Sequence, residues 1–143
     1  MIDMFKWQCT TNSAIWCRHN GDIEDAITEM LKAVEMTRPV RKLVKETAVS
    51  LNYLADLYLV AGADDRAEEA LRESITLARP RYPYLLAPNL WILGRLQLRQ
   101  GKVREALASA EESLRVSRRA KHDFGVRRAE ELIQEVRTQL TPG

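Results

Sequence analysis

The chain of 143 residues has only two cysteines, few aromatic residues and no long apolar run. Cys9 and Cys17 would lie about 12 Å apart along a helix axis, which excludes a disulfide between them. With no CxxC pair and no cysteine framework, we expect a reducing compartment and a cytoplasmic protein. The first residues lack the apolar stretch of a signal peptide, and no segment approaches the roughly 20 apolar residues of a membrane span.

The chain also has no strong net charge and none of the common catalytic motifs. Lysine and arginine number 22 against 20 acidic residues, a net charge of +2, which gives no strong field for nucleic acid or membrane. The two histidines, His19 and His122, have no second ligand at helical spacing, so we expect no metal site. Without a glycine-rich phosphate loop, a GxSxG motif or an HExxH motif, we expect neither an enzyme nor a cofactor.

Glycine is scarce, but three of the glycines repeat with a fixed context. Each stands five residues before an alanine that opens an amphipathic stretch: Gly21 before Ala26, Gly62 before Ala67, and Gly101 before Ala106. The glycines are 41 and 39 residues apart, a period that is typical of stacked helical hairpins. Each glycine is expected to end one helix in the left-handed conformation. Spacing of three and four predicts helices at about 4–20, 23–37, 40–61, 65–79, 84–100, 103–121 and 124–140.

Further positions agree when the units are aligned on these glycines. Small residues recur seven positions before each glycine and again twelve after it: Ala14, Ala55 and Gly94, then Ala33, Ser74 and Ser113. Small side chains on both helices of a hairpin allow the two backbones to approach closely. Arginines end the second helices, at Arg38, Arg79 and Arg118, where a positive charge complements the helix dipole.

These residues resemble the tetratricopeptide repeat family. Leu93-Gly94, Gln100-Gly101 and Ala106 are close to that family's pattern, and Leu54-Ala55, Tyr58, Gly62 and Ala67 form another good copy. The first unit is poorer, because Ser13 and Cys17 stand where leucine and tyrosine are usual. The period exceeds the standard 34 residues. It is similar to the long-repeat variety, of about 40 residues, seen in kinesin light chains and in bacterial signalling regulators.

The resemblance implies an all-α, right-handed α-solenoid formed by a single domain over residues 1–143. We expect about three hairpins, at about 4–37, 40–79 and 84–121, and a C-terminal capping helix at 124–140, seven helices in all. The capping helix should have an apolar face of Ala129, Leu132, Ile133, Val136 and Leu140 and a polar outer face. The implied function is that of a protein-binding scaffold, as an adaptor or as the sensor part of a regulator.

In the family, ligand peptides lie in a concave groove lined by the first helices of successive units. Carried over by spacing, the predicted groove residues are Ile15, Arg18, Asn52, Asp56, Leu59, Trp91, Arg95, Leu98 and Arg99. Such a surface suits a partner protein or peptide with apolar and acidic side chains, since tryptophan and arginine often dominate binding energy. Packing of Trp91 against a neighbouring helix fits the sequence equally well. The paired lysines and asparagines with which co-chaperone modules clamp a carboxylate are absent here.

Two alternatives remain at this stage. Met4, Phe5 and Trp7 place large apolar groups on the first helix, which indicates an edge for homo-oligomerisation, a missing upstream domain, or side chains that fold back over the first pair. A weaker hypothesis is nucleic-acid binding by the cluster Arg115, Arg118, Arg119, Lys121, Arg127 and Arg128. This cluster lacks interleaved aromatic residues and has glutamates nearby, so nucleic acid is not the expected partner.

Overall fold

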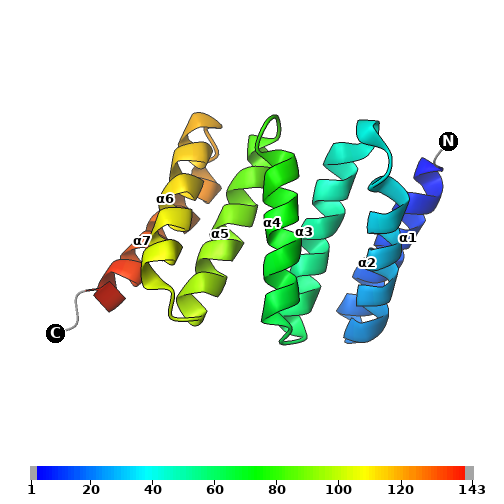
Figure 1. Cartoon of the computed structure of the whole chain (residues 1–143), viewed down its shortest axis with the longest axis horizontal. Coiled ribbons are helices and arrows are strands. Elements are labelled where there is room, and N and C mark those ends of the chain that lie inside the picture. Colours follow the sequence, from blue (N-terminus) through cyan, green and yellow to red (C-terminus); the bar gives the residue numbers. More distant parts are fainter. Residues whose placement is uncertain (1–2, 141–143) are drawn as a thin grey trace. The chain divides into compact units, whose positions relative to one another are not determined.

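A computed structural model of the chain describes residues 3–140, and these residues are almost entirely helical (Figure 1). They form seven α-helices and one short 3-10 helix: α1 (Met4–His19), α2 (Ile23–Thr37), η1 (Arg41–Leu43), α3 (Val44–Val60), α4 (Asp64–Ala78), α5 (Pro83–Arg99), α6 (Val103–Arg119) and α7 (Asp123–Leu140). The predicted all-α class with seven helices is confirmed. The predicted helix at 40–61 is shorter, because Val40 after Pro39 is extended (φ −101°, ψ 106°) and η1 precedes α3.

The three repeat glycines adopt the predicted left-handed conformation between the helices of each hairpin. Gly21, Gly62 and Gly101 have φ values of 86°, 78° and 79°. A Cβ atom built on any of the three would have no neighbour within 4 Å. Backbone conformation, and not lack of space, therefore requires glycine at these turns. Lys121, in the turn before α7, has a φ of 55° and is the only non-glycine residue with positive φ within residues 3–140.

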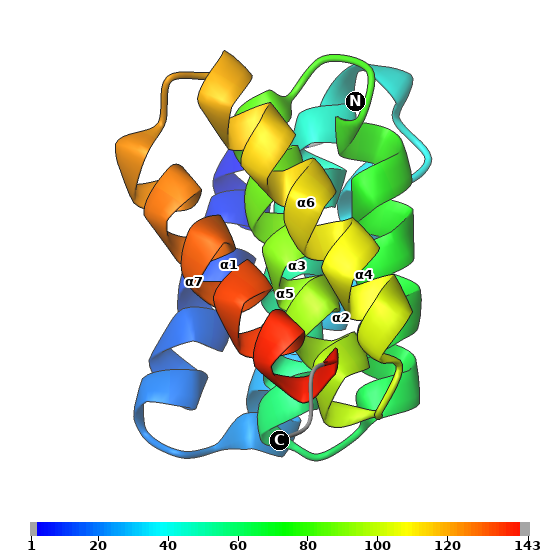
Figure 2. The same ribbon diagram turned by 90° about the vertical axis from the view of Figure 1, so that its left-hand side faces the viewer.

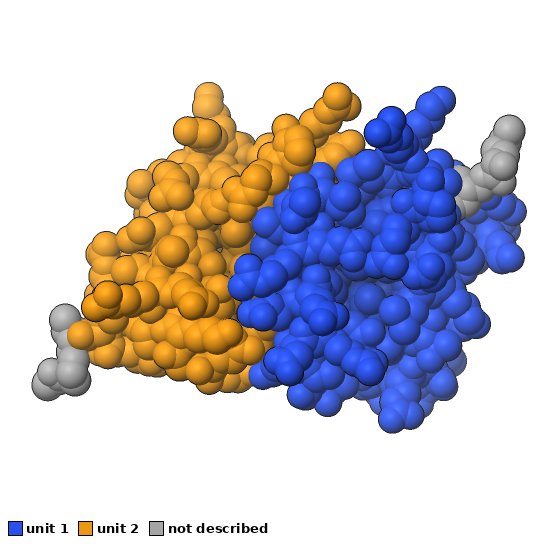
Figure 3. Space-filling view, in the orientation of Figure 1, with its two compact units in different colours: residues 1–77 blue, residues 78–143 orange. Residues whose placement is uncertain are grey.

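The chain divides into two compact units, residues 1–77 and residues 78–143 (Figure 3). In unit 1, α2 packs against both α1 and α3. The helices approach closely because small side chains occupy their contacts, and the wholly buried alanines of this unit are Ala14, Ala26, Ala33, Ala48, Ala55 and Ala67. The hydroxyl of Ser74 on α4 donates a hydrogen bond to the carbonyl oxygen of Ala48 on α3, at 2.8 Å. The alanine and serine columns of the sequence thus mark helix–helix contacts.

Unit 2 contains α5, α6 and α7, and α7 contacts both of the other helices (Figure 2). A Cβ atom on Gly94 would lie 3.0 Å from Leu132 Cδ2 and 3.4 Å from the carbonyl oxygen of Ala106, so glycine permits this three-helix contact. The core cluster consists of Leu98, Ala106, Ala110, Leu132, Ile133 and Val136. The apolar face of α7 is buried as its pattern predicts, except for Leu140, which is 40% exposed.

The arginines that end the second helices do more than complement the helix dipole. Each forms an ion pair with a glutamate of another helix: Arg38 with Glu73 at 2.8 Å, Arg79 with Glu112, and Arg118 with Glu130 at 3.3 Å. The hydrogen bond from Arg38 to Glu73 raises the pKa of Arg38 further, against a smaller opposing effect of partial burial. Because the arginine side chains are about half exposed, we expect each pair to contribute little to stability.

Candidate partner-binding site

The predicted groove residues of unit 1 lie on α1 and α3, and two of them contact each other. Arg18 Nε donates a hydrogen bond to Asp56 Oδ2 at 2.8 Å, and both side chains are about half exposed. The structure therefore brings these two positions of α1 and α3 together. It also shows that the two charges largely neutralise each other, so Arg18 is not an unpaired cation for an acidic partner. Asn52 and Leu59 are half-buried on α3.

Ile15 borders a shallow hollow between α1, α2 and α3. Its side chain is 42% exposed, and the hollow is also lined by Arg18, Tyr53 and Leu57. The volume of about 10 Å³ is room for about one water-sized group. This part of unit 1 therefore offers a shallow apolar contact surface.

Trp91 in unit 2 packs against α7, which is the second of the two placements that the sequence left open. Its indole Nε1 donates a hydrogen bond to the carbonyl oxygen of Arg128 at 3.2 Å. The guanidinium carbon of Arg128 lies 3.4 Å from the centre of the indole ring, and that of Arg95 lies 5.0 Å from it. These are cation–π contacts, which are strongest with tryptophan. Trp91 remains partly accessible to solvent.

Leu98 was predicted to line the groove, but this prediction is wrong. It is only 9% exposed and belongs to the core cluster of unit 2, together with Leu132 and Ile133 of α7. Trp91, Arg95 and Leu98 follow one another at helical spacing on α5, and α7 covers the end of this stripe that contains Leu98. Arg95 and Arg99 are exposed on α5.

A pocket opens where α5 and α7 begin and α6 ends. We call it the α7 pocket, and its principal lining residues are Pro88, Trp91, Ser117, Phe124, Gly125 and Arg128. Its volume of about 60 Å³ is enough for several water-sized groups. Phe124 and Tyr84 are 57% and 53% exposed and lie at its mouth, whereas Ser117 is 1% exposed and lies at its buried end.

Arg128 is the charged group of the α7 pocket. Its guanidinium group stacks on Trp91 and also lies 5.2 Å from the ring centre of Phe124. Within residues 3–140, Arg128 forms no ion pair. Partial burial lowers the pKa of Arg128, the positive charge of Arg95 lowers it further, and Glu131 acts in the opposite direction. The guanidinium group nevertheless stays charged at physiological pH.

Ser117 contributes a buried hydroxyl group to the same pocket. Among residues 3–140, its Oγ has no hydrogen-bond partner, although it is almost wholly shielded from solvent. The neighbouring Ser113, which also lines the pocket, is satisfied, because its Oγ donates to the carbonyl oxygen of Ala87 at 2.9 Å. An unpaired buried hydroxyl is unusual, since most buried polar side-chain atoms have a partner.

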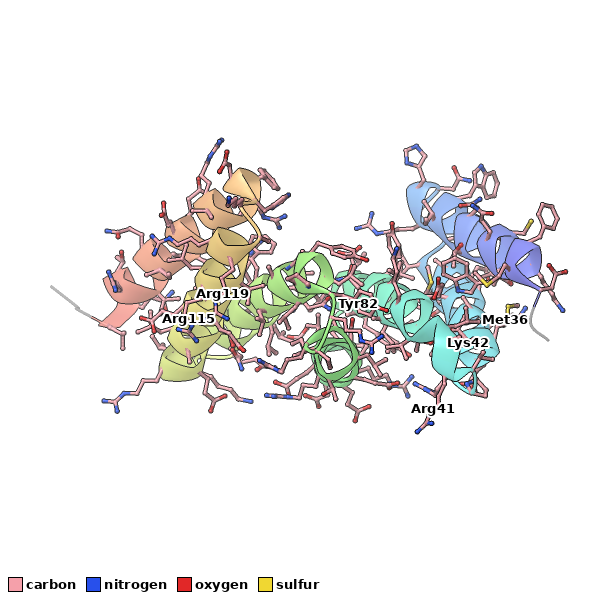
Figure 4. The ribbon with its side chains drawn as sticks, turned by 90° about the horizontal axis from the view of Figure 1, so that it is seen from above. Met36, Arg41, Lys42, Tyr82, Arg115 and Arg119 are labelled. Atoms are coloured by element: carbon pink, nitrogen blue, oxygen red, sulfur yellow. The ribbon has the colours of Figure 1, made fainter. Side chains whose placement is uncertain are left out.

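The two units differ in charge. Residues 78–143 contain 13 basic and 7 acidic residues, a net charge of +6, whereas residues 1–77 contain 9 basic and 13 acidic residues, a net charge of −4. Arg115 and Arg119 lie one turn apart on α6 and add to the positive charge of unit 2 (Figure 4). The surface around the α7 pocket is therefore attractive to acidic groups.

The predicted oligomer edge on α1 divides into buried and exposed side chains. Trp7 folds back, and its Nε1 donates a hydrogen bond to Ser50 Oγ at 3.1 Å. Phe5 is 73% exposed and Met4 is 39% exposed. Trp16, eleven residues after Phe5 and thus on the same face of α1, is 65% exposed. Trp7 is therefore folded back, whereas Phe5 is left exposed.

Sequence reasoning missed four of the residues that define the α7 pocket: Pro88, Ser117, Phe124 and Gly125. It grouped Arg128 only with its basic neighbours. No local pattern joins Trp91 to Arg128, because the two are 37 residues apart in sequence. Among residues 3–140, no group of three His, Cys, Asp or Glu side chains is placed to hold a metal ion, and no helix is long and apolar enough to cross a membrane.

Comparison with known proteins gives one family and several similar structures. Residues 8–79 match the family described as tetratricopeptide repeat. BtubC (BKLC) from P. vanneervenii superimposes with a TM-score of 0.71 at 16% identity, over 96% of this chain and 66% of that one. Two structures of a putative kinesin light chain with nearly identical TPR-like repeats from Podosopora anserina, one of them a variant, are also similar. The variant gives a TM-score of 0.69 at 18% identity over 92% of this chain and 73% of its own. The other gives a TM-score of 0.66 at 17% identity over 100% of this chain and 80% of its own.

These likenesses support an all-α helical-repeat solenoid fold. The chain spans slightly less than two thirds of the length of BtubC. No curated protein matches the sequence.

Proposed function

Since the chain belongs to the tetratricopeptide repeat family, we propose that it binds a segment of another protein with apolar and acidic side chains. Such repeats in general form protein–protein interaction scaffolds and are typically not enzymes. The role of this scaffold would be that of an adaptor or of the sensor part of a regulator, within a single repeat domain. The free thiols of Cys9 and Cys17 support a reducing, cytoplasmic location.

The observation that carries this proposal is the surface of unit 2. Trp91, Arg95 and Arg128 lie together there, within a unit of net charge +6. Tryptophan and arginine are the residue types that most often dominate binding energy at protein interfaces. A positive surface also speeds the encounter with an acidic partner. In unit 1, Ile15, Asn52 and Leu59 would add apolar and polar contacts.

A displayed peptide library tests the proposal without knowledge of the natural partner. Selection on the immobilised chain should enrich peptides that combine apolar residues with aspartate or glutamate. Binding of the selected peptides should weaken about tenfold or more in Arg95→Glu, because the substitution reverses a charge beside Trp91. Arg104→Glu, the same change near the start of α6, is the matched control and should have a small effect. Enrichment of basic peptides, or equal binding by both variants, would contradict the proposal.

Homo-oligomerisation through α1 is a second candidate, favoured by the exposure of Phe5 and Trp16 on one face. A shared apolar face of this kind is typical of self-association. Light scattering over a range of protein concentrations should then give a mass above that of the monomer. The double substitution Phe5→Glu with Trp16→Glu should restore the monomer mass. A monomer at all concentrations would remove this candidate.

A further inference from the structure

The outer side of α1 is exposed at positions that the other first helices bury. Trp16 stands five residues before Gly21, and Leu57 and Leu96 stand five residues before the next two repeat glycines. Both leucines are 2% exposed, whereas Trp16 is 65% exposed. The repeat therefore covers this position in its other two copies, but leaves a larger apolar side chain uncovered in α1.

Cys9 gives a second example of the same difference. It stands twelve residues before Gly21, and the corresponding residues of α3 and α5 are Ser50 and Asn89. Both of these are wholly buried, whereas Cys9 is exposed. Among the residues of α1, only Thr11 and Ala14 are buried.

The exposed side of α1 also has no charge over about three turns. None of the eleven residues between Lys6 and Arg18 is acidic or basic at neutral pH. Few charges together with exposed aromatic residues are typical of the core of a protein–protein interface, whereas a solvated helix face usually carries charged side chains. We call this surface the α1 face, and it consists of Phe5, Gln8, Cys9, Asn12 and Trp16.

A head-to-tail contact with α7 of another copy would not suit the α1 face. The exposed side of α7 carries Arg127, Glu131 and Glu135, and their burial against an apolar surface would be costly. A contact of α1 with α1 of a second copy instead buries the same uncharged face on both sides. Such a contact is two-fold symmetric and closes the assembly at a dimer.

The packing of unit 1 indicates the direction of this contact. There α2 covers α3 and runs in the opposite direction (Figure 1). A second α1 that runs antiparallel would cover α1 in the same way. With Phe5 placed against Trp16 of the partner subunit, each large aromatic side chain meets another one, and such pairs add to the burial of apolar area.

The charges at the ends of α1 favour the same direction. In the antiparallel arrangement, Asp3 lies near Arg18 of the partner subunit, whereas a parallel arrangement would bring Lys6 near Lys6 of the partner subunit. Within residues 3–140, Arg18 donates to Asp56 through Nε, and its two Nη groups are open to a further carboxylate.

We propose that two copies of the chain pair through the α1 face as an antiparallel, two-fold dimer. Phe5 lies against Trp16 of the partner subunit, and Cys9 lies against Asn12 of the partner subunit. This geometry deepens the second candidate function, self-association through α1, and rests on it. One helix from each copy buries less than the about 800 Å² per partner of a standard interface, so we expect a dissociation constant on the order of 10–100 µM.

The mass of the full chain, measured by light scattering from about 1 to about 300 µM, tests the contact itself. It should rise from that of the monomer to that of the dimer over this range. Trp16→Glu should weaken the dimer at least about tenfold, because it places a charge in the centre of an apolar contact. Val60→Glu is the matched control, since Val60 on α3 is a similarly exposed apolar residue outside the α1 face, and it should change the dissociation constant less than about twofold.

Two single-cysteine variants test direction and register. One is Cys17→Ser, which keeps Cys9, and the other combines Cys9→Ser, Cys17→Ser and Asn12→Cys. In an equimolar mixture oxidised mildly with diamide, the disulfide between the two variants should form well above its statistical share. The reason is that positions 9 and 12 of the two copies face each other. Either symmetric pair would be offset by three residues, about 4.5 Å along the axis, which exceeds the reach of a disulfide.

Mass spectrometry distinguishes the mixed disulfide from the two symmetric ones. A monomer mass at all concentrations would overturn both this dimer and self-association through α1. A dimer that Trp16→Glu weakens no more than Val60→Glu does would show that the contact lies outside the α1 face. Preferential formation of symmetric disulfides would overturn the antiparallel arrangement and leave self-association standing. None of these outcomes affects the selection of acidic peptides, so the scaffold function and the dimer can fail separately.

Discussion

The three tryptophans of the chain allow a direct test of how strongly α7 is held by α5. Trp91→Phe keeps an aromatic ring but removes the indole N–H that donates to the carbonyl oxygen of Arg128. Trp7→Phe removes a similar donor to Ser50 Oγ. Trp16→Phe is the matched control, because Trp16 is 65% exposed and makes no side-chain hydrogen bond among residues 3–140.

The expected loss of stability follows from these contacts. One partly buried hydrogen bond is worth about 1 kcal/mol. Phenylalanine also forms a weaker cation–π contact than tryptophan, which adds roughly 0.5 kcal/mol at Arg128. Trp91→Phe should therefore lower the free energy of unfolding by about 1.5 kcal/mol and Trp7→Phe by about 1 kcal/mol. Trp16→Phe should stay within about 0.5 kcal/mol of the wild type.

Urea unfolding followed by circular dichroism measures these differences, and amide hydrogen exchange locates them. In Trp91→Phe, exchange should accelerate chiefly in α7, since this helix loses its hydrogen bond to α5. If Trp91→Phe proves no more destabilising than Trp16→Phe, the indole of Trp91 does not hold α7, and the reasoning on the α7 pocket fails with it.

Further predictions concern single contacts. Gly62→Ala should lower the free energy of unfolding, measured by thermal or urea melts, by about 1 kcal/mol, because a residue with a Cβ atom is strained at a φ of 78°. The added Cβ atom itself would have no neighbour within 4 Å. Lys121→Gly should raise it by roughly 0.5–1 kcal/mol, since lysine is strained at a φ of 55°, and a loss of stability would refute this. In the same melts, Ser113→Ala should lower the free energy of unfolding by about 1–2 kcal/mol and Ser117→Ala by less than about 0.5 kcal/mol, because only the first substitution breaks a hydrogen bond. Arg38→Ala should lower the free energy of unfolding by about 0.5 kcal/mol at low salt and by almost nothing in about 1 M salt, because salt screens its ion pair with Glu73. A loss of stability that persists in salt would show that packing of the side chain matters more than its charge.

The fold could be predicted because its main determinants are local. Each hairpin turn has a glycine with positive φ, and each close helix contact has a buried alanine. The two features recur together in the sequence, as Gly21, Gly62 and Gly101, each with a buried alanine five residues later. The start of α3 at Val44 rather than at residue 40 could not be predicted, because Val40, Val44 and Ala48 continue one apolar stripe at helical spacing through the residues that form η1. The left-handed residue before α7 leaves no such trace either, because it is Lys121 and not glycine.

The candidate site could be predicted only in part, because its contacts join distant residues. Spacing on one helix places Trp91 and Leu98 on one stripe, but it does not show that α7 buries Leu98 and leaves Trp91 at a pocket. It likewise places Arg18 and Asp56 on the same surface without showing that they pair. Such contacts depend on which helix covers which face, and the sequence of one helix does not contain this information.

Gly125 presents a case in which helix propensity and tertiary packing predict opposite results. It lies in the first turn of α7, where Gly→Ala should stabilise a helix by up to about 1 kcal/mol. A Cβ atom at this position would, however, lie 2.6 Å from Ser117 Oγ and 2.8 Å from His122 Nδ1. Overlap with a buried group typically destabilises by about 1–3 kcal/mol. We therefore expect Gly125→Ala to destabilise the wild-type chain.

The same substitution in a Ser117→Ala background gives the decisive comparison. Removal of Ser117 Oγ takes away the nearest clash, but it leaves His122 Nδ1 at 2.8 Å and the Cβ of residue 117 at 3.2 Å. In this background Gly125→Ala should therefore destabilise less than in the wild-type chain, and a double-mutant cycle by urea unfolding should give a coupling of about 1 kcal/mol. Additive effects would mean that Gly125 and Ser117 do not press against each other. The buried end of the α7 pocket would then be packed less tightly than the structure shows.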